Sequence, residues 1–140
     1  MSRVWTAVLV ALAAGSCTIS IDPRAASIPM EVAVSNLKEL LPKSSCVSFV
    51  ESELVINQSE IRGWKVDPTG LEFQSGRMEP FRLAWSDSRG VELVKFPLRF
   101  ELRIFVGVPG RRKDHLHISW KDGRDARHAA ELFESLRGDR

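Results

Sequence analysis

The chain has 140 residues, of which 44% are hydrophobic and 27% are charged, and its formal net charge is +2. This length fits one domain, and the apolar content excludes a generally disordered chain. The composition also excludes a nucleic-acid partner, because the charge is small and such binding needs cations clustered on one face.

The first sixteen residues have the pattern of a secretory signal. Arg3 precedes an uncharged, mostly apolar run over residues 4–14, and small residues follow that run. This order is typical of a leader that is removed after export. The run is too short for a membrane span, which needs about 20 apolar residues. We therefore predict that residues 1–16 are a signal peptide and that Cys17 begins the mature chain, rather than that this segment is a buried helix.

The end of this leader resembles the lipobox of bacterial lipoproteins. In the segment Ala14-Gly15-Ser16-Cys17, two small residues precede a cysteine, although the family usually has leucine where Ala14 stands. The resemblance implies a diacylglycerol on the Cys17 thiol and a further acyl chain on its amino group. It also implies the bacterial cell envelope, at the periplasmic face of the outer membrane, because Thr18 stands where a retention signal would carry aspartate.

Ordinary signal cleavage at the same small residues is the alternative. Cys17 and Cys46, the two cysteines of the sequence, could then form a disulfide in an oxidising compartment. If Cys17 is acylated, Cys46 is a lone thiol at the start of a strand, where a small buried cysteine is usual.

The mature chain divides into a linker and a domain. Residues 17–29 contain two prolines and little periodicity, so we expect a lipidated tether there and a single domain over residues 30–140. An apolar stripe after Pro29 predicts a helix that runs to Leu41 and is stopped by Pro42.

From Cys46 onward, apolar residues recur at every second position, which predicts strands. The segment 67–70 separates two such runs, and its proline and glycine are typical of a type I turn, so we expect a hairpin there. Residues 86–90 predict another turn, with the next strand starting at Val91. Residues 115–120 form the last alternating run.

The longest alternating run is Phe96 to Val106. Its apolar residues share one face, which predicts a strand with one buried and one wet side. Arg99, Glu101 and Arg103 share the opposite face. We expect these three charges to be solvated and to form weak pairs.

The chain ends in a predicted amphipathic helix. Asp122 is a suitable N-cap, and Gly138 is a suitable residue just beyond the C-terminus of the helix. His128 falls on the exposed side. The stripe that predicts burial consists of Ala126, Ala129, Ala130, Phe133 and Leu136.

Together these elements predict an α+β, mainly β fold. We expect a six- to seven-stranded antiparallel curled sheet or barrel, with a short N-terminal helix and a C-terminal helix as its cap. This order resembles the pleckstrin-homology-like superfold and the small bacterial lipoproteins of unassigned function that carry it. The alternative is an α+β sheet with both helices on one face. The residues that carry the resemblance are 64–73, 81–85, 116–120 and the closing helix.

The pleckstrin-homology-like resemblance implies the binding of lipids, peptides or proteins rather than catalysis. The basic phosphoinositide loop of some members has no clear counterpart here. No Gly-x-Ser-x-Gly nucleophile setting and no glycine-rich phosphate loop occurs in the sequence. We therefore expect no enzyme and no cofactor.

Two histidines are the candidate metal ligands. His115 and His117 lie two apart on one predicted strand, so they share a face, and Asp114 and Ser119 are the local additions. A zinc site usually needs four ligands, and a solvated outer face is the favoured interpretation.

A basic cluster is the candidate binding loop. Arg111, Arg112 and Lys113 follow Val108-Pro109-Gly110. They could contact acidic lipid headgroups or an acidic partner. A solvated loop between two strands is the favoured interpretation.

These observations predict a membrane-anchored, non-catalytic binding or assembly module of the bacterial envelope. Its partners would be the membrane, through lipid on Cys17, and an envelope protein that binds at a sheet edge by strand addition. The alternative is a small secreted hydrolase or metal-binding protein that uses His115, His117 and a distant carboxylate.

Overall fold

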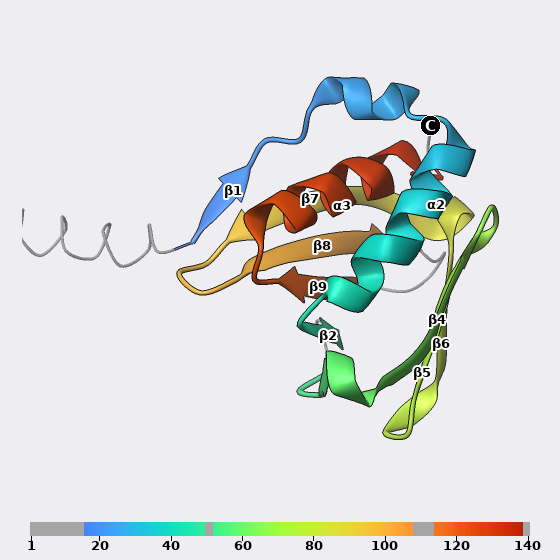
Figure 1. Ribbon diagram of the computed structural model, residues 1–140, viewed down its shortest axis with the longest axis vertical. Coiled ribbons are helices and arrows are strands. Elements are labelled where there is room, and N and C mark those ends of the chain that lie inside the picture. Colours follow the sequence, from blue (N-terminus) through green and yellow to red (C-terminus); the bar gives the residue numbers. More distant parts are fainter. Residues whose placement is uncertain (1–15, 50–51, 108–113, 139–140) are drawn as a thin grey trace, which may run out of the picture.

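The structure is a computed structural model that describes residues 16–49, 52–107 and 114–138. Its strands form two antiparallel sheets (Figure 1). The larger sheet has six strands in the order β1 (Cys17–Ile19), β7 (Ser88–Lys95), β8 (Phe100–Val106), β9 (Asp114–Trp120), β2 (Cys46–Phe49) and β3 (Val55–Asn57). The smaller sheet has three, β4 (Ile61–Asp67), β5 (Gly70–Ser75) and β6 (Met78–Ala84).

Two α-helices and four short 3-10 helices complete the described chain. Helix α3 contacts β7, β8 and β9, while helix α2 contacts α3 and β4. Figure 1 shows both helices on the same side of the larger sheet. The helices are α2 (Met30–Leu40) and α3 (Gly123–Ser135), and the 3-10 helices are η1 (Pro23–Ser27), η2 (Leu41–Lys43), η3 (Gln58–Glu60) and η4 (Trp85–Asp87).

The mainly β class, the antiparallel pairing and both predicted α-helices are confirmed. The expected single curled sheet or barrel is wrong for the described residues, because their strands divide between two open sheets. A helix laid on a sheet face buries the apolar side chains that a barrel would bury against each other, so closure is not needed. The helix placement matches the alternative, with both helices on one side, and the pleckstrin-homology-like resemblance stays a prediction.

The core is organised by one row of apolar side chains across the larger sheet. Five residues on five successive strands are paired in register, and each has an exposed fraction of 0%. Side chains of a strand alternate between its two faces. This row therefore fixes which residues of these five strands point toward the helices and which point to the outer face. The row consists of Leu93, Leu102, Ile118, Val47 and Ile56.

Helix α3 packs closely because its buried stripe is rich in alanine. Ala126, Ala129 and Ala130 each have an exposed fraction of 0%, and small side chains let the helix approach its neighbours. The Asp122 carboxylate accepts hydrogen bonds from two backbone amides of the first turn, which confirms the predicted N-cap. Gly138 has a different role from the one predicted: its backbone N–H donates to the Ser88 carbonyl at 2.9 Å.

Two strand starts differ from the sequence-based prediction. Strand β8 begins at Phe100 rather than Phe96, because residues 96–99 form a tight hairpin connection closed by a bond from Phe96 N–H to Arg99 O of 2.8 Å. Pro97 has no N–H for a ladder, which favours a turn there. Strand β7 begins at Ser88, inside the segment predicted as a turn.

The segment over residues 17–29 is folded onto the domain, which differs from the expected tether. Strand β1 pairs with β7, and η1 contacts α3. Ala25 is 3% exposed, and Ile19 and Ile28 pack against the core. These apolar residues lose contact with water by packing, so the segment follows the surface instead of spanning a gap.

The close approach of β5 to β6 requires Gly70. A Cβ at this position would lie 2.1 Å from the Leu83 carbonyl oxygen, whereas at Gly76 nothing lies within 4 Å. We expect Gly70→Ala to lower the free energy of unfolding by about 2 kcal/mol, because backbone atoms must move apart. The matched Gly76→Ala should change it by less than about 0.5 kcal/mol. Urea unfolding measures both, and equal effects would contradict this register.

The β4–β5 turn should make stability depend on acid. The Asp67 carboxylate accepts hydrogen bonds from the Thr69 hydroxyl, the Thr69 N–H and the Gly70 N–H, and these bonds hold the pKa of Asp67 below its usual 3.8. A lowered folded-state pKa stabilises the fold above the usual pKa, and this contribution is lost as the pH falls through the folded-state pKa. We expect Asp67→Asn to lose less stability than wild type between about pH 5 and pH 3. Identical acid slopes in urea unfolding would contradict the role of these bonds.

Candidate functional site

Cys17 lies at one corner of the larger sheet. Its side chain is exposed, and its register partner on β7 is Lys95. Lys95 pairs in turn with Phe100 on β8, and Phe100 pairs with Trp120 on β9. The strand alternation places these four residues on the helix side of the sheet, in a row at its end.

A shallow open hollow of about 760 Å³ lies beside this row. Gly123 begins α3 at its edge, and a Cβ there would lie 2.7 Å from the Phe100 ring. The glycine therefore lets the first turn of α3 approach the sheet end. Ile19 and Phe100 line the apolar part of the hollow, and Lys95, Lys121, Arg124 and Arg127 are its basic residues.

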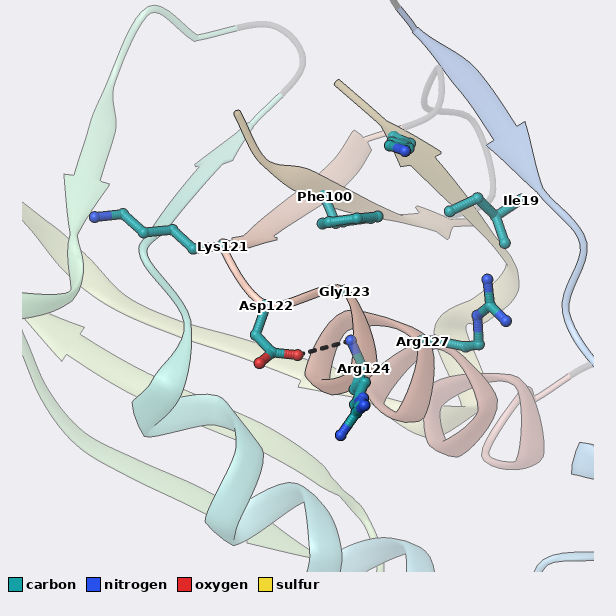
Figure 2. A pocket seen from close by; sticks show the side chains of 8 residues that line it. Ile19, Phe100, Lys121, Asp122, Gly123, Arg124 and Arg127 are labelled. Carbon is teal, nitrogen blue, oxygen red and sulfur yellow. Dashed lines mark hydrogen bonds between the residues drawn. The ribbon is translucent and has the colours of Figure 1, made fainter. Parts of the chain in front are cut away.

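The hollow has a positive electrostatic character. Asp122 is its one acidic lining residue, and that carboxylate accepts the Arg124 N–H at 2.7 Å as the cap of α3. The amino end of a helix adds a partial positive charge. Figure 2 shows Phe100 over Gly123 and the Arg127 side chain pointing toward Ile19, whereas Lys121 points away. The arrangement suits an anion at an accessible surface rather than an enclosed substrate.

A second charged cluster lies on the outer face of the larger sheet. Glu101 is 7% exposed, and Arg103 Nε lies 2.9 Å from its carboxylate. Arg99 Nη2 and His117 Nδ1 lie 4.0 and 3.7 Å from Glu101 Oε1. The prediction of a solvated Glu101 is therefore wrong. Its register partners Val94 and Ser119 are also buried, so this part of the outer face is covered by side chains.

The structure brings one of the two predicted metal ligands to a carboxylate. His117 is beside Glu101, but the side chain of His115 is outside the described part of the chain. Among the described residues there is no group of three His, Cys, Asp or Glu side chains that could hold a metal ion. His128 is exposed, as predicted.

The predicted binding loop lies outside the described residues. Arg111, Arg112 and Lys113 fall in the range 108–113, for which no placement is given. Strand β8 reaches Val106 at its far end from Phe100, a distance of about 20 Å at the rise of a strand. The loop therefore follows the end of β8 that is remote from Cys17.

Sequence reasoning missed the cations that line the hollow beside the row of Cys17. Arg124 and Arg127 carry a detectable signal, because they are three apart on the exposed side of the predicted helix. Lys95 and Lys121 carry none, since only the strand order brings them to the same hollow.

Comparison with protein-family models, with curated proteins and with solved structures finds no match to this chain. Among the described residues, no helix has the length and apolar character that crossing a membrane requires.

The strand order opposes a disulfide between Cys17 and Cys46. Strands β1 and β2 are separated by β7, β8 and β9, which is four steps of about 4.8 Å, or about 19 Å. Disulfides need Cα atoms within about 7 Å, and both thiols are free in the structure. The alternative prediction from the sequence, a disulfide between Cys17 and Cys46, is therefore wrong in this fold.

This separation predicts the effect of removing Cys17. In residues 17–140 refolded under oxidising conditions, Cys17→Ser should change the free energy of unfolding by less than about 0.5 kcal/mol, because the residue is exposed. Loss of a native disulfide would instead cost about 2–5 kcal/mol. Urea unfolding without reductant measures the difference, and a loss in the disulfide range would contradict the strand order.

Proposed function

We propose that this protein is a lipid-anchored, non-catalytic binding or assembly module of the bacterial cell envelope. The observation that carries the proposal is the position of Cys17. It follows a leader-like segment and small residues in the sequence, and it is exposed as the first residue of an ordered strand. The thiol is therefore accessible at the start of strand β1.

The proposed anchor is strong and rigid. Each buried CH₂ group contributes about 0.8 kcal/mol, so several acyl chains hold a protein on a membrane far longer than one. Because Cys17 is paired with Lys95 in the sheet, the lipid would be joined to the folded domain without a flexible linker. Such an anchor restricts the domain to orientations that place this corner toward the bilayer, in our proposal at the periplasmic face of the outer membrane.

The partner of the proposed module is an envelope protein that adds a strand to a sheet edge. The edge strands of the larger sheet, β1 and β3, have three residues each. Strand β6 offers a longer edge of seven residues in the smaller sheet. Pro80 lacks an N–H, so residues 81–84 provide the uninterrupted part of this edge.

The alternative of a secreted hydrolase or metal-binding protein that uses His115 and His117 has less support. The carboxylate beside His117 belongs to Glu101, which is bonded to Arg103 at 2.9 Å. A metal or a substrate would have to compete with a charge-assisted hydrogen bond. We therefore regard the Glu101 cluster as a structural ion pair.

Replacing the anchor cysteine tests the proposal. We expect full-length Cys17→Ser to move almost entirely from the membrane pellet to the soluble fraction after a high-salt wash, because the acyl chains are lost. Cys46→Ser should stay in the pellet and serves as the matched control. Fractionation with immunoblotting measures the distribution, and mass spectrometry of the wild-type N-terminal peptide measures the modification. An unmodified Cys17 in a processed wild-type chain would overturn the proposal.

A further inference from the structure

We infer that the corner of the domain beside Cys17 binds anionic phospholipid headgroups directly, with Leu98 entering the bilayer interface. Two features form this surface. The tip is the β7–β8 connection, residues 96–99. The basic rim consists of Lys95, Lys121, Arg124 and Arg127, the cations that line the hollow. The inference rests on the proposed function for the nearness of a membrane, and the experiment below separates the two.

The tip presents an apolar side chain at its apex. Leu98 is 90% exposed, whereas the other exposed large hydrophobic residues of the described chain are 44–46% exposed. The tip is held by the hydrogen bond from Phe96 N–H to Arg99 O at 2.8 Å. The Arg99 guanidinium also lies 4.4 Å from the centroid of the Phe96 ring. Leu98 is thus presented by an ordered turn, so little conformational entropy is lost when it enters an interface.

The tip and the proposed anchor lie at the same end of the larger sheet. Lys95 is the register partner of Cys17 and is also the last residue before the tip. Neighbouring strands are about 4.8 Å apart, so lipid on Cys17 would hold the tip at the bilayer surface. Figure 1 shows the start of β1 and the β7–β8 connection at the same end of the molecule. A single exposed leucine is common in proteins. The role inferred for Leu98 therefore depends on its position beside the proposed anchor.

The basic rim complements an anionic surface. Two of the three nearby carboxylates are engaged: Asp122 caps α3, and Glu101 lies against Arg103 and Arg99 on the outer face. The third, Asp125, lies in the first turn of α3. The rim therefore has four cations against these three acids, and the hollow that the cations line is open to solvent. Basic residues close to an anionic membrane increase binding roughly fivefold each. An apolar residue at the apex of a turn, with cationic residues beside it, is typical of surfaces that contact the membrane interface.

Cosedimentation with vesicles tests the inference without the lipid anchor. The mature chain, residues 17–140 carrying Cys17→Ser, is mixed with vesicles of phosphatidylcholine alone or with 30% phosphatidylglycerol (about a third of the lipid). We expect binding to the anionic vesicles, little binding to the neutral ones, and loss of binding at about 0.5 M NaCl because salt screens the attraction. Equal binding to both vesicles, or none to either, would overturn the inference.

Variants of the tip and the rim assign the contact to this corner. We expect Leu98→Ser to weaken vesicle binding about tenfold, and the double variant Lys95→Ala with Arg124→Ala about twenty-fivefold, at roughly fivefold for each cation. Val32→Ser and Lys65→Ala are the matched controls, since Val32 and Lys65 are exposed on α2 and β4, and they should bind as the parent does. Circular dichroism checks that each variant is folded.

The outcomes separate this inference from the proposed anchor. If the tip and rim variants bind vesicles as tightly as the controls, the surface contact is wrong, whereas fractionation of Cys17→Ser still tests the lipid anchor. If inorganic phosphate at millimolar concentration displaces the protein from vesicles completely, the rim is a site for a soluble anion and the inference is also wrong. A chain that binds anionic vesicles but carries no lipid on Cys17 would overturn the anchor alone.

Discussion

The fold depends on the register of the larger sheet. The buried row from Leu93 to Ile56 crosses five strands. A slip of one residue in a strand would move its member of the row to the outer face and put a neighbour, such as Glu92 or Arg103, among the core residues. The same register aligns Cys17, Lys95 and Phe100 at the sheet end. Packing in the middle of the sheet thus determines which residues surround the proposed anchor, although none of them belongs to the buried row.

The pairing of β1 with β7 changes how a lipid anchor at Cys17 would affect the orientation of the domain. On a flexible tether, a domain samples many orientations and its surface has no defined relation to the bilayer. Attached to a strand of the sheet, the proposed lipid would restrict these orientations, and the tip and the basic rim would be the parts nearest the membrane. The acyl chains and the surface contact would then reinforce each other, because the second contact forms at a high effective concentration.

The outer face of the same sheet has a different organisation. Burial of Glu101 has a desolvation cost that is offset by the 2.9 Å bond to Arg103 and by the proximity of Arg99 and His117. The cluster is therefore understood as a satisfied ion pair within a covered part of the sheet. In the sequence, the alternation of Arg99, Glu101 and Arg103 is identical for a solvated and a buried face, and only the neighbours Val94 and Ser119 separate the two cases.

The sequence by itself determined the local elements: the helix after Pro29, the hairpin turn at Asp67, the alternating core of β8 and β9, and the Asp122-capped helix. These elements depend on contacts within a few residues, and their hydrophobic periodicity and capping residues can be recognised directly in the sequence. The sequence also marked Cys17 as the candidate anchor. Only the tertiary structure decided that the strands form two sheets, that residues 17–29 pack on the domain, and that Lys95 pairs with Cys17 beside the hollow that Arg124 lines. Strand order joins residues far apart in the chain, and the free energy that selects it comes from burying the whole core at once.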